Sequence, residues 1–274
     1  MQEKLTYRKI YDIIKSIKQN AIEKHTKVFT NIYTLYNEIE QSEYAFCVQG
    51  ANGIVFWKKD NWDVCRVFFV ASDLLELSVL LSEVPSDVVM DYNTHKNNNM
   101  LNQFFIKAGF QLKASYVRKG MGIQGIGYED VSAHSDILDD YYDESIVEYA
   151  LYSDIDEIMQ IIEDTFDKET DHLPARENLI EWIKNKWVLI YREEGKIYTI
   201  YIYEIFGKKM YSALSYNSVT ADKMYTLEKK GYLDAVQKYD VQYIYAWFNR
   251  ENFGAMKRNV LKEDGLINYI YKKQ

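Results

Sequence analysis

The stretch MYSALSYNSV (Met210–Val219) is followed by TADKMYTLEKKGYLDAVQKY (Thr220–Tyr239) and QYIYAWF (Gln242–Phe248). The outer segments have the aromatic-rich pattern of β-strands, and the middle segment is typical of an amphipathic helix from about Met224. A strand that leads directly into a helix presents unpaired backbone N–H groups and the positive end of the helix dipole. This order therefore predicts a site for an anionic group where the helix begins.

The composition is that of a folded, acidic protein. With 274 residues, of which 47% are apolar and 27% charged, the chain has enough material for one large domain or two of ordinary size. Its 33 basic and 41 acidic side chains give a net charge of −8. Such a chain lacks the broad positive field that attracts phosphate backbones, so we do not expect a nucleic-acid partner.

Cysteine usage and the absence of targeting signals favour the cytoplasm. Cys47 and Cys65 lie in apolar runs that resemble strands. A disulfide between them is an alternative, but two thiols in a chain of this size are better explained as small buried groups in a reducing compartment. Met1–Leu5 lacks the apolar core of a secretory signal, and no window approaches the ~18 uninterrupted apolar residues of a membrane span. We therefore expect a cytoplasmic protein with no membrane partner.

One order of elements occurs twice along the chain. In the first half, a strand at Val88–Tyr92 is followed by a polar segment, a helix and a closing strand that ends at Arg118. In the second half, the strand Gln242–Phe248 is followed by the same elements, and its closing strand ends at Tyr271. Each block is preceded by two helices, three antiparallel strands and a further helix, which indicates an internal repeat.

The repeat predicts an α+β fold with α/β three-layer architecture, built from two domains that each have a mixed, mostly antiparallel sheet flanked by helices. The domains are expected at 1–125 and 146–274, with a linker at 126–145 where glycines give way to acidic residues. The leading helices are expected at 8–24, 31–40, from Ser153-Asp154, and at Ala175–Lys186. The strands are expected at Tyr44–Gln49, Gly53–Lys58, Asp63–Val70, Trp187–Arg192, Lys196–Phe206 and Met210–Val219.

Three short segments add specific residues to this element order. They are EYALYSDI (Glu148–Ile155), AWFNRENFGA (Ala246–Ala255) and, in the first half, AGF (Ala108–Phe110) with YVR (Tyr116–Arg118). They resemble, in turn, the first strand and helix start, the fifth strand with its Asn-x-x-Ala helix start, and the closing turn and strand of the GNAT acyltransferase family. The resemblance covers nearly the whole chain as two copies. It implies transfer of an acyl group, most simply acetyl from acetyl-CoA, to an amine of a small molecule or peptide.

The cofactor loop departs from the family pattern. The family's pyrophosphate loop, Gln/Arg-x-x-Gly-x-Gly/Ala, aligns with Thr220–Tyr225, where Lys223 and Tyr225 replace the two small residues that let backbone approach phosphate. Asp222 adds repulsion for a phosphate, which the charge of Lys223 partly offsets. Asn252 is expected either to hydrogen-bond the pantetheine arm or to cap the following helix. The resemblance thus assigns acetyl-CoA binding to Asn217, Val219, Thr220, Lys223, Met224, Tyr225 and Asn252.

Acyl transfer needs a base for the amine, an oxyanion contact for the thioester carbonyl and an acid for the thiolate. On the strands expected to line the site, Glu204 is the candidate base, acting through water, and Tyr216 is the candidate acid. Strand N–H groups near Ser215–Asn217 are the candidate carbonyl donors. The family's frequent general-acid tyrosine aligns with Asn259, which has no proton to give at neutral pH.

The first half has no comparable loop. Its strand up to Val70 runs almost directly into Ser72-Asp73, with Ser72 as the expected helix cap, so we expect a cofactor-free structural copy. The match of Gly120–Gly125 to Gly-x-Gly-x-x-Gly follows a closing strand and does not open a helix, so a dinucleotide site is not predicted. The four histidines, His25, His95, His134 and His172, have no ligand-like spacing, so no metal is predicted.

Two other functional classes remain open from the sequence. One is a non-catalytic binding or scaffold protein that has lost its cofactor, which the missing loop glycines favour. The other resembles the tandem-GNAT aminoacyl transferases that use charged tRNA, and the net charge of −8 disfavours it.

Overall fold

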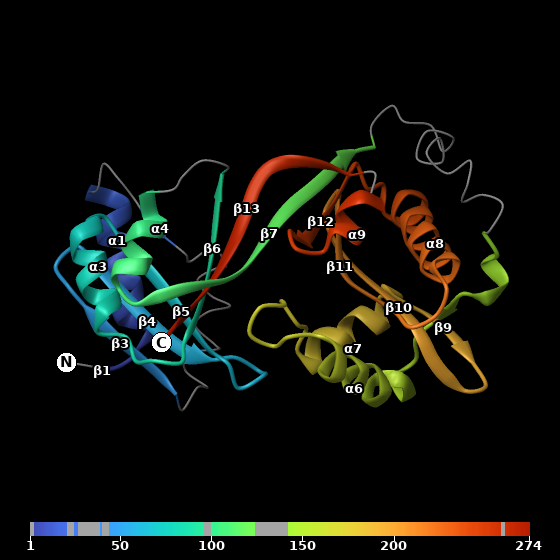
Figure 1. Ribbon diagram of the computed structural model, residues 1–274, viewed down its shortest axis with the longest axis horizontal. Helices are drawn as coiled ribbons and strands as arrows, with labels where there is room; N and C mark the ends of the chain where they lie inside the picture. The colour runs from blue at the N-terminus through green and yellow to red at the C-terminus, as the bar shows by residue number, and fades with distance from the viewer. Residues whose placement is uncertain are drawn as a thin grey trace. The chain divides into compact units, whose positions relative to one another are not determined.

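The computed structural model describes residues 3–20, 25–26, 39, 44–95, 100–123, 142–258 and 261–274. The expected helix at 31–40 apart from Ile39, most of the expected linker and Asn259 lie outside these residues. The chain divides into two compact units (Figure 1). Unit 1 comprises Met1–Tyr116, Lys168–Thr170 and Leu266–Gln274, and unit 2 comprises Val117–Asp167 and Asp171–Gly265.

Unit 1 has a mixed, mostly antiparallel sheet in the order β1-β3-β4-β5-β6-β13-β7. β3, β4 and β5 form the expected antiparallel meander, β5 and β6 run parallel, and the last part of β13 pairs antiparallel with β6. The bounds are β1 (Glu3–Lys4), β2 (His25–Thr26, paired with β5), β3 (Ala45–Gln49), β4 (Gly53–Lys59), β5 (Cys65–Ala71), β6 (Val89–His95), β7 (Phe110–Gly122), β13 (Lys262–Lys273), α1 (Tyr7–Asn20), α3 (Leu74–Ser82) and α4 (Met100–Lys107).

Alternating residues of the unit 1 meander face two helical layers. Ile54 and Phe56 of β4 pack with Ile10 of α1, whereas Val55 and Trp57 pack in the core that α3 and α4 cover. This alternation is the period of two that sends successive strand side chains to opposite faces of a sheet. Unit 1 is therefore a three-layer arrangement, as the sequence predicted.

Unit 2 repeats this arrangement with the strand order β7-β12-β11-β10-β9-β8. α8 packs on one face through Leu227 and Ala235 against Tyr201, Tyr203 and Met210 of the sheet. α6 and α7 lie on the other side of the sheet (Figure 1). The bounds are β8 (Glu148–Tyr149), α6 (Ile155–Thr165), α7 (Arg176–Lys184), β9 (Val188–Glu193), β10 (Lys196–Phe206), β11 (Lys209–Asn217), α8 (Ala221–Tyr239), β12 (Tyr243–Asn249) and α9 (Phe253–Arg258), with 3₁₀ turns η2 (Glu144–Ile146) and η3 (Tyr152–Asp154).

Two expected helix caps differ in the structure. α3 is capped by Asp73 and not by Ser72, because the Asp73 carboxylate accepts hydrogen bonds from the N–H groups of Leu75 and Glu76. Asp154 stands at the N-cap position of α6, but its carboxylate makes no capping bond. It accepts instead from the backbone N–H of Leu151 at 2.8 Å and pairs with a guanidinium.

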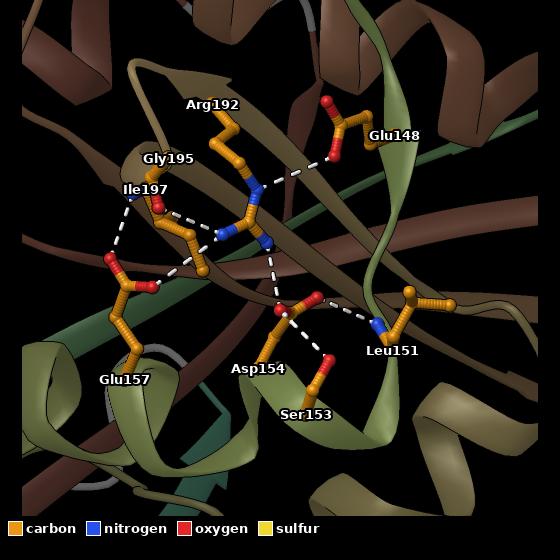
Figure 2. A network of polar contacts seen from close by, with 8 residues as sticks. All are labelled: Glu148, Leu151, Ser153, Asp154, Glu157, Arg192, Gly195 and Ile197. Carbon is orange, nitrogen blue, oxygen red and sulfur yellow. Dashed lines mark hydrogen bonds and ion pairs between the residues drawn. The ribbon is translucent and has the colours of Figure 1, made fainter.

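That guanidinium belongs to Arg192 of β9 and holds the start of α6 against the β9–β10 hairpin (Figure 2). Its Nη2 lies 2.8 Å from Asp154 Oδ1, and its Nη1 donates to the carbonyl of Gly195 at 3.1 Å and lies 3.7 Å from Glu157 Oε2. Glu148 pairs with Nε at 3.5 Å. Because Asp154 is 7% exposed, its charge depends on this cation rather than on water.

Replacing Arg192 by Met is expected to lower the free energy of unfolding by about 2 kcal/mol, because a buried carboxylate loses its partner. The matched control is Arg176→Met, which breaks an exposed pair with Asp156 (2.7 Å, side chains 49% and 84% exposed). This control is expected to change the free energy of unfolding by less than ~0.5 kcal/mol. Urea unfolding of both variants measures the difference. Equal losses would show that the network around Asp154 is no more stabilising than a surface pair.

Candidate active site

The candidate site lies where β11 and β12 of unit 2 stop pairing. Their parallel register runs from Lys209↔Tyr243 to Ser212↔Ala246. β11 continues to Asn217, still paired with β10, and β12 continues to Asn249. Within the described residues, the end of β11 therefore has one edge without a strand partner. Such an edge offers backbone donors and acceptors to an extended chain that contains amides.

A β-bulge stands at the point where the two strands part. In the β10–β11 register, Tyr203 pairs with Ser212 and Ile202 with Leu214, so Ala213 is the extra residue. A bulge bends its strand and re-aims the residues that follow it. Here it moves Leu214 to the opposite face from Met210, although regular alternation puts the two on one face. No residue pattern indicates this bulge, because Ala213 fits a regular strand equally well.

On the face of the sheet opposite α8, a polar and aromatic row crosses three strands. Glu204 of β10 stands opposite Tyr211 of β11, which in turn pairs with Tyr245 of β12. The two tyrosine rings stack with centroids 5.2 Å apart and an interplanar angle of 16°. The Arg118 guanidinium of β7 lies 5.3 Å from the Tyr245 ring centroid and 6.0 Å from that of Trp247. The row is thus a carboxylate followed by an aromatic surface with an arginine at its far end.

Of the two charged residues in this row, Arg118 has an ion-pair partner and Glu204 has none within the described chain. Arg118 is paired with Asp264 at 2.6 Å. Glu204 accepts a hydrogen bond from the Trp182 side chain of α7, and no lysine or arginine of the described chain lies within ion-pair distance of it. Burial raises the pKa of Glu204, and the nearby carboxylate of Glu181 raises it further. Burial also raises the pKa of Tyr211 well above its usual value, so that phenol stays protonated. The site therefore offers a carboxylate whose negative charge has no cation partner.

The two expected catalytic residues share this face but lie on either side of the bulge. Tyr216 pairs with Ile200, four residues from Glu204 along β10. At ~3.3 Å per residue, this puts the two Cα positions about 13 Å apart. Glu204 thus lies beside the stacked tyrosines, and Tyr216 lies on the part of β11 that has separated from β12.

The turn before α8 is closed by its own hydrogen bonds. The Asn217 side-chain amide donates to the carbonyls of Val219 (3.3 Å) and Thr220 (3.1 Å), and its oxygen accepts from the Thr199 hydroxyl at 2.8 Å. Asp222, in the first turn of α8, accepts from the Thr220 hydroxyl and from its own backbone N–H, and these contacts lower its pKa. A carboxylate of the protein therefore already stands at the positive end of the helix.

The remaining expected cofactor residues are divided among other roles. The Lys223 ammonium lies 3.5 Å from Asp222 and 5.2 Å from the Tyr191 ring centroid. Met224 packs in the core between α8 and the sheet, and Tyr225 is half-buried. Asn252 caps α9 by accepting from the N–H of Ala255 at 3.0 Å, and α9 begins at Phe253. The capping alternative for Asn252 is therefore the one observed.

These contacts test how far the site suits coenzyme A. The free edge of β11 suits the neutral, amide-containing pantetheine arm. The start of α8 does not suit a pyrophosphate, because Asp222 is already bound there and like charges repel. The site therefore suits the pantetheine end of the cofactor and does not suit its pyrophosphate end. Within the described residues, no group of three or more metal-ligating side chains occurs, and no helix there is long and apolar enough to cross a membrane.

Comparison with solved structures identifies the fold. A GCN5-related N-acetyltransferase from Sphaerobacter thermophilus aligns with a TM-score of 0.58 at 9% identity, covering 100% of this chain and 95% of that one. A tandem GNAT protein from the clavulanic acid biosynthesis pathway aligns at 0.54 and 5% identity (99% and 97% covered). A GNAT-family acetyltransferase from Colwellia psychrerythraea aligns at 0.53 and 10% identity (100% and 99% covered). No protein-family model and no curated protein matches the sequence. The chain therefore has a two-domain GNAT-like α+β fold, and the expected fold is confirmed.

Proposed function

We propose that unit 2 is an N-acyltransferase that moves an acyl group, most simply acetyl, from a pantetheine thioester such as acetyl-CoA to an amine of a small molecule or peptide. The observation that carries this proposal is the bulged end of β11, which has no partner along one edge and follows directly on the row that begins at Glu204. Cys47 and Cys65 are both reduced, which suits the cytoplasmic location that we propose with it.

In the proposed reaction, the amine nitrogen attacks the thioester carbonyl carbon. A C–N bond forms, the C–S bond breaks, and the thiolate leaves. Glu204 takes the proton of the amine through a water molecule, and Tyr216 gives a proton to the thiolate. N–H groups of β11 between Ala213 and Asn217 donate to the carbonyl oxygen as its charge develops. The raised pKa of the Glu204 carboxyl suits a general base, because a higher proton affinity makes the carboxylate a better proton acceptor.

The row beside Glu204 also supports an amine acceptor. Most amines are cationic at neutral pH, and the Glu204 carboxylate has no ion-pair partner in the described chain. The stacked rings of Tyr211 and Tyr245 offer aromatic faces that attract an ammonium group. The ammonium must lose a proton before it attacks, and the same carboxylate is placed to receive it.

A non-catalytic binding protein is the second candidate, and Asp222 is the observation that favours it. A helix start already neutralised by a carboxylate is what a protein without a nucleotide cofactor would tolerate. The two candidates differ in whether the chain releases thiol from a thioester.

The experiment is a thiol-release assay with the purified chain, ~1 mM acetyl-CoA and a panel of small and peptide amines, with acetylated product identified by mass spectrometry. Amine-dependent thiol release supports the acyltransferase. Calorimetric titration with CoA and with pantetheine accompanies it. The proposal fails if no amine stimulates release and neither ligand binds saturably at millimolar concentration, which would favour the binding protein.

A further inference from the structure

We propose that unit 2 recognises its acyl donor through the pantetheine arm alone, and that the nucleotide end of coenzyme A adds no affinity. This inference rests on the proposed acyl transfer and specifies the donor class for it. The class is pantetheine thioesters, whether the far end of the arm carries a nucleotide or a carrier protein.

Several backbone N–H groups before and at the start of α8 already have acceptors within the protein. Ser218 N–H donates to the Tyr198 carbonyl at 3.0 Å, and Val219 N–H points to the Asn217 side-chain oxygen at 3.4 Å. The N–H of Asp222 is bonded to its own carboxylate, and that of Lys223 donates to the Thr220 carbonyl at 3.3 Å. A phosphate cradle needs such groups free and convergent. Here these four N–H groups are already hydrogen-bonded within the protein.

The start of α8 also carries a negative charge of the protein's own. The Asp222 carboxylate is fixed at the start of α8 by the Thr220 hydroxyl and by its own N–H. The Lys223 ammonium is 3.5 Å from that carboxylate, so the cation nearest to the helix start is already paired. A pyrophosphate brought to this place would meet a negative charge held by hydrogen bonds. The loop thus repels the part of coenzyme A that a glycine-rich loop would attract.

The unpaired edge at the end of β11 remains available to the donor. The edge of β11 beyond Ser212 has left β12, and the bulge at Ala213 re-aims its backbone groups. Backbone pairing with an extended chain requires amides and no charge, which is what the pantetheine arm offers. Recognition therefore shifts from the charged end of the donor to its neutral arm.

The test compares donors that differ only beyond the arm. The ratio of kcat/KM for acetyl-CoA to that for acetyl-pantetheine is expected to lie within about threefold of one, because each charge-assisted hydrogen bond to a phosphate would add on the order of tenfold. An acetylated phosphopantetheinyl carrier protein forms a third arm. Use of the carrier within about threefold of acetyl-pantetheine supports the inference, whereas a preference of more than tenfold for the carrier would show that contacts beyond the arm add to recognition and would overturn it.

A matched pair of variants tests the cause. Asp222→Asn removes the charge at the start of α8 and is expected to raise affinity for CoA about tenfold while leaving pantetheine affinity unchanged. Asp240→Asn makes the same charge change at the exposed C-terminal end of α8, where Asp240 pairs with Lys208, and is expected to change neither. Equal responses of the two variants would remove Asp222 from donor selection and overturn the inference.

The outcomes separate this inference from the proposed function. A preference of more than tenfold for acetyl-CoA over acetyl-pantetheine overturns the inference and leaves the acyltransferase standing. If no donor supports transfer and neither CoA nor pantetheine binds saturably, both are overturned. Saturable binding of both ligands with similar affinity, but without transfer, supports arm recognition and removes the catalytic proposal.

Discussion

A chain that ends at Gly265 is expected to lose the native structure of unit 1, although the deleted residues are the last nine of the sequence. Those residues, Leu266–Gln274, belong to unit 1, where β13 lies between β6 and β7 in the sheet order (Figure 1). Their register with β6 runs from Leu266↔His95 to Lys272↔Val89. Deletion would remove a strand from the interior of the sheet and leave β6 and β7 each with one edge that has lost its partner.

The expected loss is large because the deleted strand carries core and capping contacts. Ile270 and Tyr271 are 0% and 1% exposed, and the Tyr271 ring packs edge-on against Phe105 with centroids 5.2 Å apart. The Lys273 ammonium donates to the carbonyls of Leu81, Ser82 and Val84 at the end of α3. Truncating one large buried aromatic costs about 3–5 kcal/mol, so loss of the whole strand is comparable with the ~5–15 kcal/mol stability of an ordinary domain.

Hydrogen exchange read by mass spectrometry checks this result. Amides of β4, β5 and β6 are expected to exchange in the truncated chain at rates close to those of an unfolded peptide. Deletion of Gln274 alone, which is exposed, is the control and is expected to leave their protection unchanged. Slow exchange in β6 of the chain that ends at Gly265 would show that unit 1 does not need the last strand.

This strand also marks what the sequence could and could not predict. The apolar and aromatic residues of Leu266–Tyr271 predicted a closing strand, which β13 confirms, because strand propensity depends on local residues. Alternation specifies which face a residue occupies, and it does not specify which strand lies alongside. The expected domain of 146–274 therefore assigned the last strand by chain order, whereas compact unit 1 includes Leu266–Gln274.

In the candidate site, too, the features that depend on neighbouring residues in the sequence could be predicted, and the contacts between distant segments could not. The charge at Asp222 and the missing small residues at Lys223 and Tyr225 were visible in the sequence. The bonds that fix Asp222 are local, but those that hold Asn217 and Ser218 in the turn depend on Thr199 and Tyr198 of the neighbouring strand, which only the fold brings near. Arg118 was predicted only as the end of a closing strand. Its stacking on Tyr245 follows from the adjacency of β7 and β12, which no local pattern encodes.

Replacing Glu204 by Gln is expected to lower the acyl-transfer rate by roughly 10²–10³-fold without lowering stability at neutral pH, since a general base contributes about this much. The wild-type rate should rise with pH through the raised pKa of Glu204, because only the ionised carboxylate accepts a proton. The variant should lose that dependence. Glu181→Gln removes a neighbouring exposed carboxylate and is the control, with an expected change of less than about threefold.

The stability of Glu204→Gln is an independent test of this role. If Glu204 had a structural role, the substitution would lower the free energy of unfolding, whereas the catalytic role predicts no such loss. The folded-state pKa of Glu204 is raised above its unfolded value by burial, so the protonated carboxyl stabilises the fold. That contribution is present below the unfolded pKa and is lost as the pH rises through the folded pKa. At neutral pH the ionised form is unfavourably buried, and Glu204→Gln should leave the urea midpoint unchanged or raise it. A rate equal to that of the wild type, or a rate loss that parallels a lower urea midpoint, would show that Glu204 is not the base. If ionised Glu204 destabilises the fold but speeds acyl transfer, its charge serves the reaction and has no structural role.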